Sequence, residues 1–566
     1  MNTLTFTAPD AGIWEQDGTH SPRPMTRYAQ EAGPEGFIKG FKYGTSRYGL
    51  LLDYIKPGYV NGFYYSKAMI VGAPENARGG PPPKPIFKLI CMCHPETRRR
   101  IKAASTVLQE KPWREHLNNW DTVLKPQSTK NHLRLQAVNI AAISDAQLAD
   151  HLTECLENSK AMAYQHHIYT ITCAVTMGDY MACTQEWTGL SPSEISQAVR
   201  GSTPISSGVT DEYLAALRVV ASDSSAAQIL SGPASAGEKL QQLQALPGDA
   251  GKTIKTYLDL VSYRVVGGYD ISCRTAIETP EMLVKSLQAT FSPEEQIRAE
   301  QKVAAQTAKI RNAVPEEHRA LFDEILAEAR LVNRLRDERS FWSDLWSSGI
   351  ARRALLEVGR RLVAKGRILE VEDALDASVA EAIALLTGAG NTPAPSAEEL
   401  ARRRHYRNTI SSDAAPPFLN GTPSPPPPVD WFPPKAQRTM KAINAFMGHL
   451  FGSSDRKSEG KTVRGISVSA GVYEGTARVI EKMDELGQIQ KGEVLVTRST
   501  STAFNYVLPL VGAIVTDRGG LMSHAAIVAR EYGLPGVVGC MVATQTIANG
   551  ARVRVDADKG EVVILS

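Results

Sequence analysis

Residues 516–531 read Thr-Asp-Arg-Gly-Gly-Leu-Met-Ser-His-Ala-Ala-Ile-Val-Ala-Arg-Glu, and this stretch decides the fold of the C-terminal part of the chain. It completes a short apolar, β-branched run at residues 512–516, which is typical of a buried strand. Gly519 and Gly520 then allow a tight turn. A helix is predicted over residues 523–532, ended by Gly533 and Pro535. The stretch therefore predicts a strand, a glycine turn and a helix that begins at or near His524.

The residues on either side of this stretch predict a small β/α domain. Residues 493–497 form a second apolar run bounded by turn residues, as expected of a buried strand. Residues 552–556 alternate strictly between charged and apolar side chains, and residues 561–565 follow across Asp558-Lys559-Gly560. That pattern predicts a β-hairpin at the end of the chain.

His524 is the candidate reactive residue of this domain. Its predicted place puts an imidazole at the positive end of a helix, where unsatisfied backbone N–H groups attract an anion. Arg518 and Arg530 are nearby cations that could assist. A neutral imidazole is available near pH 7 and is nucleophilic enough to attack phosphorus. These features predict a phosphorylated histidine, although a lone histidine is more often a structural helix cap.

Proline divides the chain. The run from Ala415 to Pro428, followed by Pro433 and Pro434, excludes a helix or a central strand and predicts an extended connector. A helix is expected over residues 436–450, and residues 452–460 supply a flexible hinge. We therefore predict three parts: a substrate-binding region at residues 1–435, a helix and hinge at 436–463, and a C-terminal domain at 464–566.

The N-terminal part is predicted to be mainly helical. Up to about residue 100, segments such as residues 62–65 and the proline-rich residues 79–85 resemble short strands and loops. Beyond that point, apolar residues recur at three and four positions in long stretches, which indicates amphipathic helices at residues 148–169, 326–339 and 352–365. The expected fold class is multidomain α+β.

Composition excludes several kinds of partner. The 566 residues are 43% hydrophobic, and 63 Lys and Arg face 60 Asp and Glu, so neither a nucleic acid nor a membrane is predicted as a partner. The sequence shows no secretory signal and no membrane-spanning run, and seven scattered cysteines are typical of a cytoplasmic protein. The cluster Cys91-Met92-Cys93-His94 is too tight for a zinc knuckle, so no bound metal is predicted.

Residues 464–566 resemble the mobile phosphohistidine domain of the phosphoenolpyruvate-utilising enzymes. That family includes phosphoenolpyruvate synthase, pyruvate phosphate dikinase, rifampicin phosphotransferase and the two-component phenylphosphate synthases. The resemblance is carried by Leu-Val-Thr-Arg at 495–498, Ala-Ile-Val-Thr-Asp-Arg-Gly-Gly at 513–520, and Ser-His-Ala-Ala-Ile-Val-Ala-Arg-Glu at 523–531 running into Gly-Leu-Pro-Gly-Val-Val-Gly at 533–539. Leu521-Met522 departs slightly from the usual pair before the serine.

The resemblance implies a swivelling β/β/α domain in which His524 is the phosphocarrier. It also implies that Gly519, Gly520, Ser523, Arg518 and Arg530 bind the phosphoryl group. Residues 352–362, with Gly366 and Glu372-Asp373, resemble the helical acceptor-side region of rifampicin phosphotransferase and phenylphosphate synthase.

Two modules of the family have no recognisable counterpart in the sequence: the glycine-rich nucleotide-binding region and the phosphoenolpyruvate barrel. The resemblance thus implies the phosphohistidine subunit of a phenylphosphate synthase-like, heteromeric phosphotransferase. ATP and Mg²⁺ would be bound by a separate ATP-grasp subunit, and the acceptor would be a small organic hydroxyl, namely a phenol or alkylphenol. The alternatives are transfer to pyruvate or to an antibiotic hydroxyl, or a non-catalytic regulatory module.

Weaker candidates lie in the helical part. His166 and His167 are candidates for the general base on the acceptor side, although core or surface histidines are favoured. Arg334, Arg336 and Arg339 are better explained as a solvated, salt-bridged helix face than as a phosphate clamp. Ordinary core packing is likewise favoured over an aromatic-accepting cavity for four tryptophans: Trp113, Trp120, Trp342 and Trp346.

Overall fold

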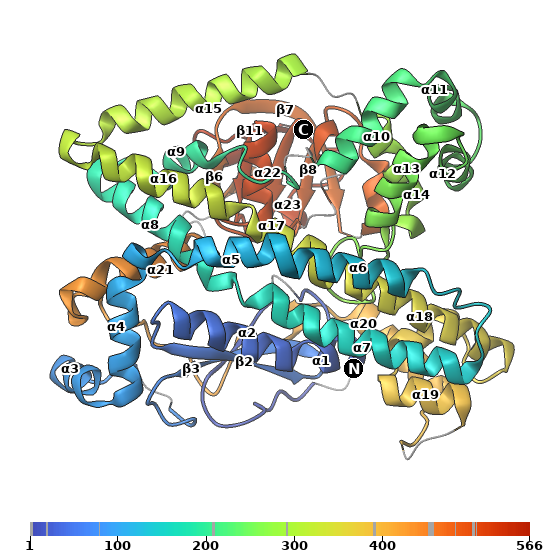
Figure 1. The fold of residues 1–566 in the computed structure, drawn as a ribbon, viewed down its shortest axis with the longest axis horizontal. Coiled ribbons are helices and arrows are strands. Elements are labelled where there is room, and N and C mark those ends of the chain that lie inside the picture. Colours follow the sequence, from blue (N-terminus) through green and yellow to red (C-terminus); the bar gives the residue numbers. More distant parts are fainter. Residues whose placement is uncertain are drawn as a thin grey trace. The chain divides into compact units, whose positions relative to one another are not determined.

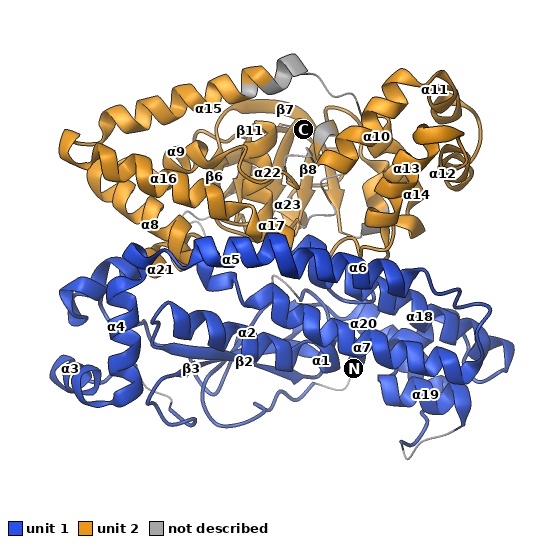
Figure 2. Ribbon diagram, viewed as in Figure 1, with its two compact units in different colours: residues 1–172, 268–273, 339–441 blue, residues 173–267, 274–338, 442–566 orange. Residues whose placement is uncertain are grey.

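The computed structural model describes residues 4–18, 21–77, 80–206, 210–289, 293–388, 392–450, 458–481, 483–500, 504 and 507–565. The chain forms two compact units, each assembled from separate segments (Figure 2). Unit 1 comprises Met1–Thr172, Gly268–Cys273 and Arg339–Lys441, and unit 2 comprises Cys173–Gly267, Arg274–Glu338 and Ala442–Ser566. Each unit combines helices with one sheet, so the predicted multidomain α+β class is confirmed.

Unit 1 contains a four-stranded antiparallel sheet in the order β2-β3-β1-β4. Its strands are β1 (Trp14–Gln16), β2 (Leu52–Val60), β3 (Phe63–Ile70) and β4 (Phe418–Leu419). The strand predicted at residues 62–65 is the start of β3, and the β2–β3 turn uses positive φ at Asn61 (50°) and Gly62 (78°). Within the proline-rich stretch, β4 lies at the sheet edge and pairs with β1, as the exclusion of a central strand requires.

Helices make up most of the rest of unit 1, and the long helices predicted at residues 148–169 and 352–365 are confirmed as α7 and α18, which end at His167 and Ala364. The expectation of strands and loops up to residue 100 is wrong in part, because residues 27–32, 34–47, 84–93 and 95–110 are helical. Pro34, Pro85 and Pro95 occupy first-turn positions, where a missing N–H costs nothing, so they start helices instead of marking loops. The helices are α1 (Arg27–Ala32), α2 (Pro34–Arg47), α3 (Lys84–Cys93), α4 (Pro95–Glu110), α5 (Trp113–Asn119), the π-helix η1 (Trp120–Leu124), α6 (Lys125–Gln136), α7 (Asp145–His167), the π-helix η5 (Ser340–Asp344), α18 (Leu345–Ala364), α19 (Val379–Thr387) and α20 (Ala397–Thr409).

Unit 2 begins with a helical part (Figure 1, green to yellow). The helix predicted at residues 326–339 is interrupted, since α16 ends at Asn333 and α17 starts at Leu335. The helices are α8 (Thr170–Thr188), α9 (Pro192–Ser196), the short η2 (Gln197–Val199), α10 (Asp211–Ser222), α11 (Ser224–Ser231), α12 (Ala236–Gln244), α13 (Gly248–Val261), α14 (Pro280–Leu287), α15 (Pro293–Ala313), α16 (Arg319–Asn333) and α17 (Leu335–Arg339).

The C-terminal domain of unit 2 has a sheet in the order β5-β12-β11-β7-β8-β9-β10-β6, drawn orange to red in Figure 1. Strands β7 to β10 run parallel, and the predicted C-terminal hairpin is β11–β12. The helix predicted at residues 523–532 is α22, which packs on β10, β6 and β9. The elements are β5 (Thr462–Arg464), β6 (Ile466–Ser469), β7 (Val472–Ile480), β8 (Val494–Thr497), β9 (Ala513–Thr516), α22 (His524–Tyr532), β10 (Gly536–Val538), α23 (Ala543–Thr546), β11 (Arg552–Asp556) and β12 (Glu561–Ile564).

Apolar packing fixes this domain on both faces of the sheet. One cluster joins Ala526 and Val528 of α22 to Ile514 of β9, and the other joins Val515 to Val553 and Val562. Every residue of β8 and β9 is buried, which explains their uninterrupted apolar sequences. The sheet therefore holds the start of α22 firmly.

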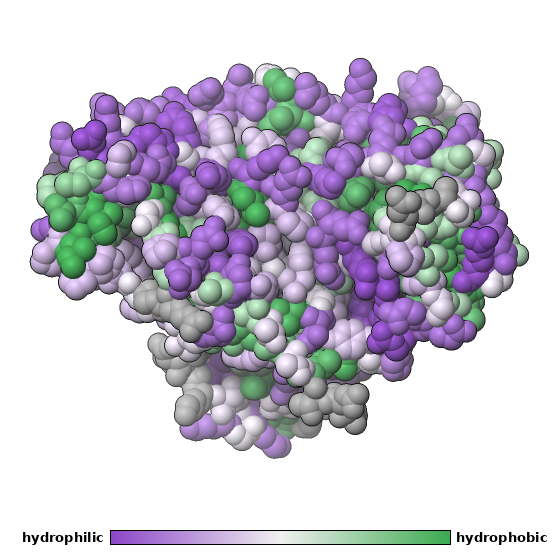
Figure 3. Space-filling view, turned by 90° about the horizontal axis from the view of Figure 1, so that it is seen from below, coloured by the Kyte–Doolittle hydropathy of each residue, from purple (hydrophilic) through white to green (hydrophobic). Residues whose placement is uncertain are grey.

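The helix expected at residues 436–450 is confirmed as α21 (Pro434–Leu450). Residues 452–457 of the predicted hinge lie outside the described residues. In the described part of the chain, no helix has the length and apolar character needed to cross a bilayer. On the face seen in Figure 3, hydrophilic side chains predominate and apolar ones form scattered patches.

Candidate active site

The turn between β9 and α22 is shaped by its glycines. Gly519 adopts φ +111°, and a Cβ atom there would lie 2.7 Å from the Ser523 hydroxyl oxygen. The Ser523 amide donates to the Gly520 carbonyl at 3.0 Å, and the Ser523 hydroxyl in turn accepts from the Ala526 amide at 3.4 Å. Ser523 is thus the N-cap of α22, and Gly519 is required for the turn that brings His524 to the helix start.

His524 is the first residue of α22 and its ring is held by a partner from another loop. Its Nδ1 lies 2.9 Å from the Thr500 hydroxyl. Its Nε2 is buried and has no hydrogen-bond partner among the residues that the structure describes. Burial, and next the positive charge of Arg336, lower the pKa of His524 to about 3. The imidazole is therefore neutral, with one nitrogen engaged and the other uncommitted.

Two guanidinium groups bind the backbone just before His524. Arg530 of α22 donates to the Leu521 carbonyl at 2.9 Å. Arg336 of α17 donates to the next carbonyl, that of Met522, and its guanidinium carbon lies 5.7 Å from the centre of the Phe446 ring. Burial lowers the pKa of Arg530 to about 10, helped by the charge of Arg336, so its guanidinium remains largely charged at pH 7. Positive charge is therefore concentrated at the N-terminus of α22 by residues of two different elements.

Four of the predicted phosphate-binding residues, Arg518, Gly519, Gly520 and Ser523, lie in or next to this turn, and the fifth, Arg530, reaches it from the last turn of α22. Arg530 is bonded to backbone, whereas Arg518 is partly exposed, with a guanidinium nitrogen 3.7 Å from the Met541 sulfur. Asp517, between β9 and the glycines, accepts from the Thr544 amide at 3.1 Å and from the Thr544 hydroxyl, so it braces the turn. The turn thus offers Gly519, Gly520 and Ser523 together with one partly exposed cation.

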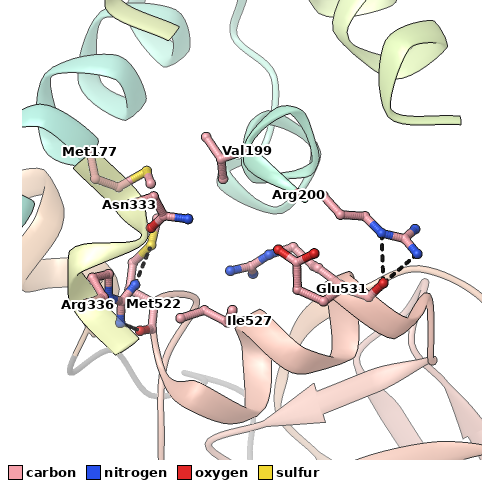
Figure 4. A pocket seen from close by; sticks show the side chains of 9 residues that line it. Met177, Val199, Arg200, Asn333, Arg336, Met522, Ile527 and Glu531 are labelled. Carbon is pink, nitrogen blue, oxygen red and sulfur yellow. Dashed lines mark hydrogen bonds between the residues drawn. The ribbon is translucent and has the colours of Figure 1, made fainter. Parts of the chain in front are cut away.

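A small, partly open cavity of about 10 Å³ lies behind this turn (Figure 4). It has room for about one water molecule and none for an organic substrate. Polar and apolar side chains from the helical part and from α22 line it: Met177, Val199, Arg200, Asn333, Arg336, Met522, Ile527, Arg530 and Glu531.

The acceptor-side candidates lie in unit 1. His166 is buried, and its Nδ1 lies 3.0 Å from a carboxyl oxygen of Asp344, which belongs to the π-helix η5. Burial raises the pKa of Asp344 to about 8. Arg339 donates to the His166 carbonyl at 2.9 Å. The His167 ring packs against Phe37 and Phe41, with ring centres 4.3 and 5.2 Å away, so the two histidines have different surroundings.

The arginine-rich segment is not the solvated helix face that its charges indicated. Arg334 does pair with Glu338 at 3.0 Å, but Glu338 and Asp337 are buried. The Asp337 carboxylate accepts from the Ser206 hydroxyl, and Arg336 reaches the Met522 carbonyl. The expectation of core packing for the tryptophans agrees with the structure, since all four are at most 5% exposed: Trp113, Trp120, Trp342 and Trp346.

Thr500 was not predicted as a site residue from the sequence, and Arg336 was assigned to a solvated helix face. Thr500 stands in a Thr-Arg-Ser-Thr-Ser-Thr run at residues 497–502, directly after β8, where loops of a parallel sheet gather functional groups. That position was a usable signal. Arg336 had no comparable signal, because its contact with Met522 joins residues 186 positions apart.

Comparison with known families supports this description. Residues 489–560 match the PEP-utilising enzyme mobile domain, and residues 166–337 match the rifampicin phosphotransferase fourth domain. The resemblance to phosphoenolpyruvate-utilising enzymes is thus confirmed. The second match ends before Arg352, so it does not include residues 352–373, where acceptor-side similarity had been expected.

Individual relatives are similar to part of the chain. The uncharacterized phosphotransferase YvkC of Bacillus subtilis is 26% identical over 56% of the chain, which corresponds to 36% of that relative. The chondramide synthase cmdD of Chondromyces crocatus is 30% identical over 51% of the chain and 8% of its own length. A rifampicin phosphotransferase of Streptomyces sviceus is 46% identical over 18% of the chain and 12% of its own length. The chain spans little more than a third, or less, of these relatives.

Proposed function

We propose that this chain, which carries the mobile domain of the phosphoenolpyruvate-utilising enzymes, is a phosphotransferase in which His524 carries the phosphoryl group. The observation that carries the proposal is the state of the His524 ring at the start of α22, where it is neutral, fixed by Thr500 and close to positive charge. We assign the proton to Nδ1, which then donates to the Thr500 hydroxyl and leaves the lone pair on Nε2. Nε2 is therefore the proposed site of phosphorylation.

Transfer from His524 is a single displacement at phosphorus. The bond between Nε2 and phosphorus breaks, a bond between phosphorus and the acceptor oxygen forms, and the hydroxyl proton passes to a base. The backbone N–H groups of the glycine turn and the nearby guanidinium charge support this step, because phosphoryl transfer depends mainly on positioning and charge neutralisation. His166, with Asp344 beside its Nδ1, is the proposed base on the acceptor side.

Phosphorylation of His524 can be tested directly. The chain, its ATP-binding partner, Mg²⁺ and ATP labelled in the β-phosphate should give a labelled, acid-labile, base-stable phosphoprotein, because the γ-phosphate leaves as inorganic phosphate. The His524→Ala variant should not be labelled, whereas His405→Ala, which replaces an exposed histidine of unit 1, should be labelled normally. Labelling of the His524→Ala variant would contradict the proposal. Absence of label in the unaltered chain would favour a non-catalytic regulatory module.

The proposed acceptor is a small organic hydroxyl, and a phenol or alkylphenol is our first choice because of the resemblance to phenylphosphate synthase. The match of residues 166–337 to a rifampicin phosphotransferase domain favours an antibiotic hydroxyl as the second choice. The phosphorylated chain should be mixed with phenol, 4-methylphenol, rifampicin and pyruvate, and the loss of phosphohistidine followed for each. Fastest transfer to rifampicin or pyruvate would overturn the phenol assignment.

The proposed phosphoryl source is ATP bound with Mg²⁺ to a separate ATP-grasp subunit. Loading of His524 by that subunit would release AMP and phosphate. The chain with ATP, Mg²⁺ and a phenol should therefore yield no product until the subunit is added. Product formation and nucleotide consumption by the chain alone would mean that it holds an ATP site of its own.

A further inference from the structure

The helix that starts at His524 is gripped at its other end by the helical part of unit 2. Glu531 lies in the last turn of α22, and Arg200 donates two hydrogen bonds to its backbone carbonyl, at 3.0 Å from Nε and 2.6 Å from Nη2 (Figure 4). The Gly201 amide donates to the Glu531 carboxylate at 2.8 and 3.0 Å, and the Thr203 hydroxyl donates to it at 3.2 Å. The backbone carbonyl and the side-chain carboxylate of Glu531 are thus both bound by one short segment, residues 200–203.

A second set of contacts holds the beginning of the same helix. The Met522 amide donates to the His449 carbonyl of α21 at 3.3 Å, and the Met522 carbonyl accepts from Arg336. The Met522 side chain is buried in a cluster with Met177 and Phe446. Residues 200–203 and Arg336 both precede the C-terminal domain in the chain, so two sites of the helical part hold α22, one near each end.

The contact at Glu531 is specific, and it is costly to form. The last carbonyls of a helix have no partner within it, so Arg200 satisfies a group that water would otherwise solvate. The carboxylate contributes less net free energy to the contact, because burial raises the pKa of Glu531 to about 7 despite its hydrogen bonds and the charges of Arg200 and Arg530. A carboxylate buried at such a cost contributes little net stability but penalises any misplacement. That balance suits a contact that must form accurately and also break.

We propose that Arg200, Gly201 and Thr203 form a docking latch for Glu531, which fixes the C-terminal domain at one station on the helical part. At this station Arg336 stands beside His524. The latch must open before the domain can carry His524 elsewhere. This inference rests on the proposed carrier function for its purpose, whereas the latch itself is a structural claim that can be tested without any activity.

Hydrogen–deuterium exchange of the full-length chain tests the latch. Replacement of Glu531 by Ala removes the acceptor of the Gly201 and Thr203 bonds. Because the cost of burying the carboxylate offsets part of the gain from these hydrogen bonds, their loss should raise the opening equilibrium by about threefold to tenfold. Faster exchange is expected in a peptide covering residues 199–206 and also in one covering residues 519–523, which contains the Met522 amide bonded to His449. The control variant Glu474→Ala replaces an exposed carboxylate of β7 and should change neither peptide.

The exchange rates of the two peptides distinguish a latch that holds the whole C-terminal domain from a contact that affects residues 199–206 alone. If the Glu531→Ala variant speeds exchange only at residues 199–206, or at neither peptide, the latch proposal is wrong. Exchange at β9 must stay slow, because faster exchange there would indicate unfolding of the domain. In that case Thr203→Val, which keeps the shape of a buried side chain and removes the hydrogen bond to the Glu531 carboxylate, replaces Glu531→Ala in the same comparison. A latch confirmed in a chain that forms no phosphohistidine would refute the proposed function alone.

Discussion

Lowering the pH from 7 to 5 is expected to leave the His524 ring neutral as long as the chain is folded. Burial, followed by the charge of Arg336, lowers the pKa of His524 from 6.5 to about 3. At pH 5 an imidazole with the ordinary pKa would be about 97% protonated, whereas one with a pKa of about 3 would be about 1% protonated. The ring thus keeps its lone pair throughout the range in which other histidines lose theirs.

The same shift makes folding depend on pH. In the unfolded chain His524 regains its ordinary pKa of about 6.5, so the unfolded state binds the extra proton and acid favours unfolding. The contribution of His524 to the free energy of unfolding is fully present above about pH 6.5, and it is lost as the pH falls towards 3. At pH 5 the loss amounts to about 2 kcal/mol, an upper value because the ring is partly exposed.

Nuclear magnetic resonance of the chain labelled with ¹³C at histidine Cε1 tests both statements. The signal missing from the His524→Asn variant identifies the residue, and it should not shift between pH 8 and pH 5. Between pH 7 and pH 5, the free energy of unfolding measured in urea should fall by up to about 2 kcal/mol more in the unaltered chain than in the variant. A His524 signal that titrates near pH 6.5 in the folded chain would refute the reasoning, and so would equal losses in the two proteins.

Three further substitutions probe the turn, the ring and the hinge. Thr500→Val removes the 2.9 Å hydrogen bond to Nδ1 and should slow phosphohistidine formation by about tenfold in single-turnover experiments; an unchanged rate would remove Thr500 from the site. Gly519→Ala should destabilise the chain by about 1–3 kcal/mol in urea, because of its φ of +111° and the contact with Ser523, whereas Gly487→Ala, which meets nothing within 4 Å, should change stability by less than about 0.5 kcal/mol. Replacing residues 452–460 by a rigid helical linker should slow turnover much more than it lowers stability, and unchanged turnover would indicate a domain that does not move.

The C-terminal domain could be predicted from sequence because its signals are local. The apolar runs at residues 493–497 and 512–516 each form one buried parallel strand, and Gly533 ends α22 with φ +67°. Turn, strand and cap signals act within a few residues, so they hold whatever the rest of the chain does. The start of α22 at His524 follows from these signals alone.

The N-terminal part was harder to predict because proline occurs both in loops and in the first turn of helices. Pro85 belongs to the proline-rich segment that was expected to be a loop, yet it occupies the first turn of α3. The composition of the units was also out of reach. Residues 268–273 belong to unit 1 although the segments on both sides belong to unit 2, and such a return depends on tertiary packing that no local pattern records.

The three arginines of residues 334–339 explain why the site was only half predictable. Arg334 pairs with Glu338 in its own helix, Arg336 binds the Met522 carbonyl 186 residues away, and Arg339 binds the His166 carbonyl 173 residues away. Only the first of these contacts follows from helical spacing. A histidine becomes reactive through its neighbours, and at His524 the neighbouring charge comes from the helical part of unit 2. The chemistry of His524 is therefore tied to the docked position of its domain, since release of α22 would expose the ring to water and move it away from Arg336.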